Sequence, residues 1–72
     1  MRNIVSAPVD VGELKKRLFQ SGKSLGELAE RAGVSRYTLF RIMNGESVRP
    51  ATLKKIADAL SVDPLDLIAA AN

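Results

Sequence analysis

The sequence predicts an all-α fold, a compact domain of five helices, from three observations. The chain has 72 residues, enough for one small domain. Its apolar residues recur at intervals of three and four, which is the period of a helix with one buried face. Residue pairs with the spacing of helix caps stand in front of these periodic segments, and Gly or Pro separates them.

The N-terminus is predicted to lie outside this domain. Residues 1–9 lack a helical period, and Pro8 disfavours a helical conformation at Ala7. We therefore expect a flexible N-terminal arm over residues 1–9, with Arg2 near its end. The remainder, residues 10–70, is expected to form a single domain.

The first helix is predicted to begin after Asp10. Asp10 and Glu13 have the spacing of a capping box, in which each side chain accepts a backbone N–H at the helix start. The helix runs to about Gln20, because Ser21-Gly22 favours a helix end. Its buried face is formed by Val11, Leu14 and Leu18.

Two shorter helices follow. Ser24 and Glu27 repeat the capping spacing, and the second helix stops at Gly33. Ser35 caps the third helix, which ends at Asn44-Gly45, the residue types that best tolerate a left-handed conformation. The second helix buries Leu25, Leu28, Ala29 and Ala32. The third buries Leu39, Ile42 and Met43.

The fourth and fifth helices each begin at a proline. Pro50 suits the first turn of a helix because it has no N–H to satisfy there, and Asp63-Pro64 with Asp66 predicts another start. The fourth helix buries Leu53, Ile56, Ala57 and Leu60. The fifth carries Leu65, Leu67 and Ile68.

The composition argues against catalysis. Cysteine and histidine are absent, so thiols, imidazole bases and two common metal-ligand types are missing. We expect no enzyme, no cofactor and no metal. A nuclease or other enzyme would have to rest on three acidic residues: Asp58, Asp63 and Asp66. These residues are better explained as two helix caps and a solvated side chain. Without a long apolar segment, the protein is expected to be cytoplasmic, with no membrane partner.

The charged residues are unevenly distributed. Residues 1–55 hold all eleven Lys and Arg residues, whereas three of the eight acidic residues and no basic one lie in residues 56–72. A basic pole favours a polyanionic partner, although many domains carry a solvated basic face.

Residues 25–44 have the proportions of a helix-turn-helix, in which two helices cross steeply through a short turn. Ala29 is predicted to lie where the two helices approach most closely. Gly33 lies at the turn, where a positive φ costs least without a Cβ. The residues expected to plug the turn and third helix into the core are Val34, Leu39 and Ile42.

The other face of residues 35–44 is then exposed, and it carries residue types that read DNA bases. Opposite the core lie Tyr37, Arg41 and Asn44, flanked by Arg36 and Phe40. Arg can form two hydrogen bonds with guanine, Asn can do so with adenine, and aromatic edges contact the thymine methyl group. Ser35 and the free amides beside it suit a phosphate.

Four motifs stand in order along the chain: Glu27 to Ser35 (ELAERAGVS), Asn44-Gly45, Arg49-Pro50, and Ala57 to Val62 (ADALSV). Through them, residues 12–68 resemble the Cro and lambda-repressor-like family of prokaryotic helix-turn-helix regulators. The resemblance implies a five-helix domain that binds operator DNA in transcriptional control. It commonly implies two such domains on half-sites about one helical turn apart.

Position by position, the resemblance implies base contacts from Arg36, Tyr37 and Arg41. It implies contacts to the DNA backbone from Ser24, Asn44 and Arg49. Lys23 and Lys54 are further phosphate candidates, although a lone lysine is at least as often simply solvated.

Three residues depart from the family pattern. Leu25 stands where many members have a Gln that bonds a phosphate and braces the recognition helix, so that support is expected to be missing. Leu18 and Met43 stand where many members have an inward Arg–Glu pair. Replacing a buried ion pair by packed apolar groups can be neutral or stabilising, so the fold is expected to survive.

Phe40 leaves three interpretations open: a boundary residue tucked against the second helix or the arm, a contact to a thymine methyl group, and a contact to a protein partner. The last leads to an alternative function, a helix-turn-helix used as a protein-interaction module through Leu25, Tyr37 and Phe40.

Oligomeric state is a separate question. We expect a weak or DNA-assisted homodimer, because a lone reader of this size contacts few base pairs. An apolar tail that a second subunit would cover, or that would fray into solvent, comprises Ile68, Ala69, Ala70 and Ala71. The sequence is also compatible with one domain of a longer regulator.

Overall fold

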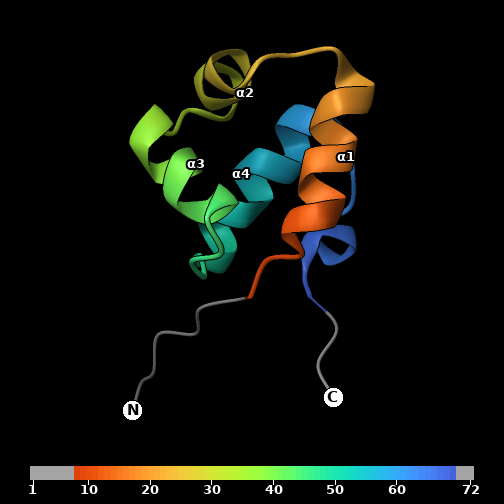
Figure 1. The fold of residues 1–72 in the computed structure, drawn as a ribbon, viewed down its shortest axis with the longest axis vertical. Coiled ribbons are helices and arrows are strands. Elements are labelled where there is room, and N and C mark those ends of the chain that lie inside the picture. The colour runs from red at the N-terminus through yellow and green to blue at the C-terminus, as the bar shows by residue number, and fades with distance from the viewer. Residues whose placement is uncertain (1–7, 70–72) are drawn as a thin grey trace.

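The structure is a computed structural model that describes residues 8–69. Arg2 and most of the predicted arm, and Ala70 and Ala71 of the predicted tail, lie outside the described residues. The elements in chain order are α1 (Val11–Ser21), α2 (Leu25–Ala32), α3 (Arg36–Met43), α4 (Pro50–Leu60) and the 3₁₀ turn η1 (Pro64–Leu67). Figure 1 shows α2 above α3 and joined by a loop to the upper end of α1, and α1 packs against both α3 and α4. The predicted all-α class is confirmed.

The predicted fifth helix was wrong: four α-helices are present in the described residues, and residues 64–67 form a single 3₁₀ turn. The start was as predicted, since Asp63 accepts a hydrogen bond from the N–H of Leu65 at 2.9 Å and Pro64 follows it. Ile68, however, is extended (φ −94°, ψ 132°) and pairs with Val9 in an antiparallel bridge. This pairing ends the helical conformation after one turn.

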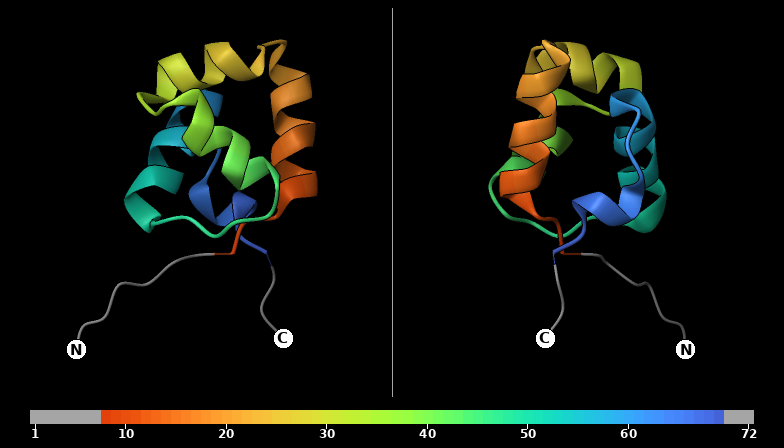
Figure 2. Two further views of the ribbon diagram at one scale, coloured as in Figure 1. Left: turned by 60° about the vertical axis from the view of Figure 1, so that its left-hand side comes forward. Right: turned by 90° about the vertical axis from the view of Figure 1, so that its right-hand side faces the viewer.

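The two ends of the described chain are joined by backbone hydrogen bonds on either side of that bridge. The N–H of Asp10 donates to the carbonyl of Leu67 at 2.8 Å, and the N–H of Ala69 donates to the carbonyl of Pro8 at 2.9 Å. The two segments emerge side by side below the helices in both views of Figure 2. Pro8, which the sequence assigned to the arm, therefore pairs with the C-terminal segment.

The helix starts follow the predicted caps, with one difference. Ser24 and Glu27 form a complete capping box on α2, and Asp10 accepts from the N–H of Glu13 at 3.0 Å on α1. Glu13 does not return the bond, because the N–H of Asp10 is already donated to Leu67. Its carboxylate accepts from Arg17 Nε instead, at 2.7 Å.

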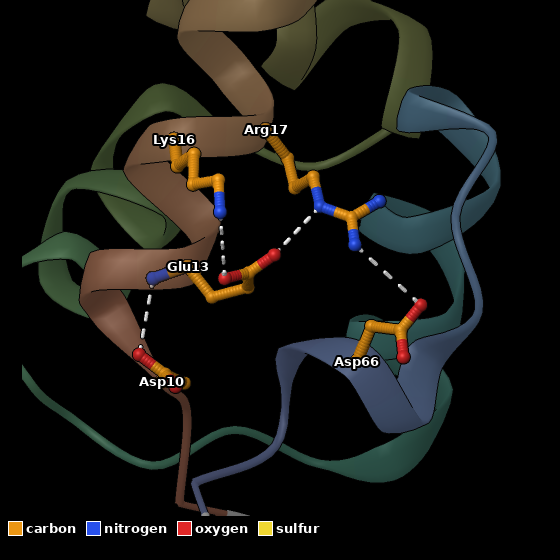
Figure 3. Close-up of polar contacts among 5 residues, drawn as sticks. All are labelled: Asp10, Glu13, Lys16, Arg17 and Asp66. Atoms are coloured by element: carbon orange, nitrogen blue, oxygen red, sulfur yellow. Dashed lines mark hydrogen bonds and ion pairs between the residues drawn. The ribbon is translucent and has the colours of Figure 1, made fainter.

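Figure 3 shows that Arg17 extends this contact to η1. Its Nη2 atom lies 3.7 Å from Asp66 Oδ2, so one guanidinium group lies between carboxylates of α1 and of η1. Ion pairs that are partly exposed stabilise a fold by little, and this contact joins η1 to α1.

Three helices end in the same backbone motif. At each end a residue with positive φ follows the helix: Gly33 (74°), Gly45 (98°) and Ser61 (59°). The next N–H then donates to the carbonyl five residues earlier, which is the long bond of a Schellman motif. These bonds are Val34 to Ala29 (3.0 Å), Glu46 to Arg41 (3.2 Å) and Val62 to Ala57 (3.0 Å).

The core is entirely apolar within the described residues. Leu18 and Met43, which replace the family's ion pair, are half-buried and pack against it. The buried residues are Leu14, Leu28, Ala29, Ala32, Leu39, Ile42, Val48, Leu53, Ile56, Ala57, Leu60 and Leu67.

Candidate nucleic-acid interface

The turn between α2 and α3 sets the orientation of the candidate interface. Ala29, which the sequence placed at the helix crossing, is buried, and Gly33 takes the left-handed conformation that the sequence predicted. Leu39 and Ile42 fix the inner side of α3 in the core, while Val34 is half-buried against it. The face of α3 opposite these residues is exposed.

Arg41 lies on that face and has two neighbours. Its Nε and Nη2 atoms both donate to Glu46 Oε1, at 2.9 and 2.5 Å. Its guanidinium carbon lies 5.6 Å from the centroid of the Tyr37 ring, within the range of a cation–π contact. The hydrogen bond from Arg41 holds the pKa of Glu46 below its ordinary value, and the same bond raises the pKa of Arg41. Both groups are therefore charged at neutral pH.

Glu46 was not among the residues predicted from the sequence. The signal was present, because Asn44-Gly45 predicts a helix end and a Schellman motif brings the second residue after the cap back to the last turn. In the structure, the N–H of Glu46 donates to the carbonyl of Arg41 itself. The backbone thus brings an acidic residue beside a basic one that is five positions earlier.

Arg36 takes a different direction from Arg41. A Cβ atom placed on Gly26 would lie 2.9–3.0 Å from three guanidinium atoms of Arg36, so that group rests directly on the first turn of α2. Leu25, where the family's bracing Gln is missing, is half-buried against the core. Contact between the starts of the two helices is made by Arg36 and Gly26 instead.

The predicted polar contacts to the DNA backbone differ in what they leave free. Ser35 Oγ accepts from the N–H of Thr38 at 3.0 Å and donates to Thr38 Oγ1 at 2.9 Å, so its hydroxyl hydrogen is already used. Ser24 Oγ accepts from the N–H of Glu27 at 3.1 Å, and the Ser24 side chain also hydrogen-bonds to the Glu27 carboxylate. Asn44 Nδ2 donates one hydrogen to the carbonyl of Phe40 at 3.0 Å and retains the other.

The remaining basic candidates lie in three different surroundings. Arg49, at the N-cap of α4, lines a cleft of about 230 Å³ together with Arg41 and Glu46. Lys54 is exposed on α4, where its Nζ atom is 3.2 Å from Asp58 Oδ2. Lys23 lines a second cleft, between α2 and α4, whose lining residues include Lys23, Arg31, Lys55 and Asp58.

Two aromatic side chains are exposed on α3. Phe40 is 57% and Tyr37 68% exposed, so Phe40 is not tucked into a boundary between helices in the described residues. Leu25, by contrast, is half-buried and offers less surface to a partner.

No group of three acidic side chains that could hold a metal ion occurs in residues 8–69. Of the three acidic residues considered above, Asp63 caps η1, Asp58 pairs with Lys54, and Asp66 approaches Arg17. Within the same residues, no helix is both long and apolar enough to cross a membrane.

Comparison with known proteins gives one curated relative and several solved structures. A protein of Pyrobaculum aerophilum named "Putative HTH-type transcriptional regulatory protein" is 39% identical over 59 residues, which is 82% of this chain and 22% of the relative. The chain therefore spans about a fifth of that relative's length.

The similar structures are of an enzyme. A mutant hydroxyethylphosphonate dioxygenase superposes with a TM-score of 0.78 at 28% identity, over 89% of this chain and 14% of the enzyme. PhpD with cadmium atoms gives a TM-score of 0.77 at the same identity and coverage.

A family model described as helix-turn-helix matches residues 14–67, which include all four α-helices in whole or in part and all the motifs on which the sequence resemblance rests. The chain therefore belongs to the helix-turn-helix family, as its similarity to the Cro and lambda-repressor-like regulators predicted.

Proposed function

We propose that this domain binds double-stranded DNA sequence-specifically, as the DNA-reading part of a transcriptional regulator, with residues 35–44 in the major groove. The observation that carries the proposal is the exposed face of α3, where Arg41 and Tyr37 stand together opposite the buried Leu39 and Ile42. A helix placed in this way fits the major groove, and its outward side chains reach base edges.

The roles proposed for single residues follow the sequence. Arg36, Tyr37 and Arg41 contact bases, and Arg41 is the best placed because it lies on the outer face; Arg36 has to leave Gly26 to do so. The DNA backbone is contacted by Ser24, Ser35, Asn44, Arg49, Lys23 and Lys54. Ser24 offers its hydroxyl group, which would turn from Glu27 to a phosphate, whereas Ser35 offers the unpaired amides of the first turn of α3.

The regulatory part of the proposal rests on the family and on the name of the Pyrobaculum aerophilum relative. Because the chain spans about a fifth of that relative, we propose that it supplies DNA recognition. Two copies on one operator would lengthen the site, and we propose a weak or DNA-assisted homodimer for that reason.

Selection of binding sites from a random pool of duplexes, at low and at physiological salt, tests the proposal. We expect one enriched motif at both concentrations and weaker total binding at the higher salt, because phosphate contacts release counterions. An inverted repeat in the motif would support the dimer. Retention of duplexes with no enriched sequence would refute sequence-specific binding.

A second candidate function is a protein-interaction module. The exposure of Tyr37 and Phe40 favours it, and so does the occurrence of a similar fold as a seventh of a dioxygenase. The half-buried Leu25 contributes least to such a surface. Phe40→Ser separates the candidates, because it should leave selected-duplex affinity within about threefold if Phe40 serves a protein partner, and lower it further if Phe40 contacts a thymine methyl group.

A further inference from the structure

We propose that Glu46 is a positioning residue that presents Arg41 to a guanine and keeps it from pairing with phosphates, and thereby sets the sequence specificity of the domain. This role rests on the proposed DNA binding and adds to it a residue outside the recognition helix. Arg41 would bind the O6 and N7 atoms of a guanine, which together accept two parallel hydrogen bonds from one arginine.

The contact geometry leaves the required edge of Arg41 available. Glu46 engages the guanidinium group from one side only, because Nε and Nη2 both donate to the single oxygen Oε1. The five N–H donors of an arginine lie in a planar fork. With Nε and one hydrogen of Nη2 occupied, both hydrogens of Nη1 and the second hydrogen of Nη2 remain. Nη1 and Nη2 together form the end of the fork, which matches the two acceptors of guanine.

Tyr37 restricts the guanidinium group from a second direction. Its ring lies under the group at 5.6 Å, while Glu46 holds the Nε edge. A flexible side chain that is held at one edge and one face has few orientations left to lose on binding. Less conformational entropy is then lost when it meets a base, which is the general advantage of preorganisation.

The carboxylate also changes what Arg41 can pair with. An arginine that is free on the surface is attracted to any phosphate, which strengthens binding to every sequence alike. Glu46 neutralises much of that attraction, since it is itself charged and its own pKa is held low by Arg41. A phosphate that approached the pair would be repelled by Glu46, whereas the neutral edge of guanine would not.

The position of Glu46 is built into the end of α3. Gly45 takes the left-handed conformation, and the N–H of Glu46 then donates to the carbonyl of Arg41. The side-chain contact therefore closes over a backbone bond between the same two residues. This fixes the carboxylate relative to the recognition helix even though both side chains are half-exposed.

Glu46→Gln tests the proposal, with Glu30→Gln as the matched control. Glu30 lies on exposed α2 surface, and both variants remove one negative charge. Affinities are measured at one salt concentration for a duplex carrying the selected motif and for a scrambled duplex of the same composition. We expect Glu46→Gln to raise affinity for the scrambled duplex and to lower the selected-to-scrambled ratio by about fivefold or more, a part of what one bidentate pair contributes. Glu30→Gln should change both affinities by the same factor.

A double-mutant cycle with Arg41→Ala excludes an indirect effect. If Glu46 acts through Arg41, then Glu46→Gln should leave the affinity ratio unchanged once Arg41 is alanine. A ratio that falls equally in both backgrounds would overturn the positioning role. So would a Glu46→Gln variant that increases affinity for both duplexes as Glu30→Gln does.

A measurement on the free protein separates this inference from the proposed function. The Nε–H of Arg41 should give a resolved ¹⁵N NMR signal with slow solvent exchange, and Glu46→Gln should abolish that protection while the amide spectrum of the core is unchanged. Equal protection in both proteins refutes the pairing whatever the domain binds. If the selection of binding sites enriches no motif, both the proposed function and this role are refuted. If it enriches a motif but Glu46→Gln leaves the selected-to-scrambled affinity ratio unchanged, only the role of Glu46 is refuted.

Discussion

The guanidinium group of Arg36 lies against Gly26, so that the first residue of α3 touches the first turn of α2. A Cβ on Gly26 would come within 2.9 Å of Arg36 Nη2, closer than side chains tolerate without moving. The neighbour is the far end of a flexible side chain, and it can move at little cost. This contact stands where the sequence predicted that support for the recognition helix would be missing.

The first prediction concerns Gly26→Ala. Alanine in place of glycine within a helix stabilises by about 0.5–1 kcal/mol. Because the new methyl group displaces Arg36, we expect less than that gain in the wild-type background and the whole gain in an Arg36→Ala background, measured by urea unfolding. Equal gains in both backgrounds would show that Arg36 does not rest on Gly26.

The second prediction concerns Ser61, which has φ of 59° at the end of α4. This conformation costs a residue with a Cβ roughly 1–2 kcal/mol, and glycine avoids that cost. Glycine gives back part of the gain, because its unfolded chain has more conformational freedom. We expect Ser61→Gly to stabilise the domain by about 0.5 kcal/mol and to raise Tm by about 2–4 °C.

The control for this change is Ser61→Ala, which keeps the Cβ and should give no such gain. Thermal unfolding followed by circular dichroism measures both variants. If Ser61→Ala stabilises as much as Ser61→Gly, backbone strain at Ser61 is not the cause.

The third prediction is a dependence of stability on pH through the α2 capping box. Hydrogen bonds to Glu27 from the backbone N–H of Ser24, and then from its side chain, hold the pKa of Glu27 below its ordinary value of 4.5. A carboxyl group whose native pKa is depressed stabilises the fold above its unfolded pKa, and that stabilisation is lost as pH falls through the native pKa. We therefore expect wild-type stability to fall as pH is lowered past 4.5.

Glu27→Gln should flatten part of that acid decline when urea unfolding is repeated between neutral pH and about pH 3. The decline is not abolished, because the pKa of Glu46 is also held below its ordinary value, by the hydrogen bond from Arg41. The control is Glu30→Gln, on the same helix but outside the capping box. Its stability should decline with acid as the wild-type stability does. Parallel curves for wild type and Glu27→Gln would contradict the capping contribution.

The helices could be predicted from the sequence because their causes are local. Ser24, Ser35 and Pro50 each act on the backbone within one turn, and the apolar periodicity that points Leu39 and Ile42 inward is also a property of one helix. The exposed face of α3 follows from the same pattern. The family was evident from motifs that the helix-turn-helix model also matches.

The features that could not be predicted depend on contacts between distant parts of the chain. Ile68 is extended because it pairs with Val9 at the other end of the domain, and no local pattern near η1 shows this. The contact between Arg36 and Gly26 depends on the crossing of two helices and on a choice among many side-chain rotamers. Glu46 lies between these cases, since its backbone position is local but its pairing with Arg41 requires both side chains to turn toward each other.

The most direct test of the account compares Arg41→Ala with Arg49→Ala on the selected and scrambled duplexes over a series of salt concentrations. We expect Arg41→Ala to lose about tenfold or more in affinity for the selected duplex and much less for the scrambled one. Arg49→Ala should weaken binding to both by the same factor and reduce the salt slope by about one. Equal losses on both duplexes from both variants, or binding that does not change with salt, would contradict a DNA-reading face on α3.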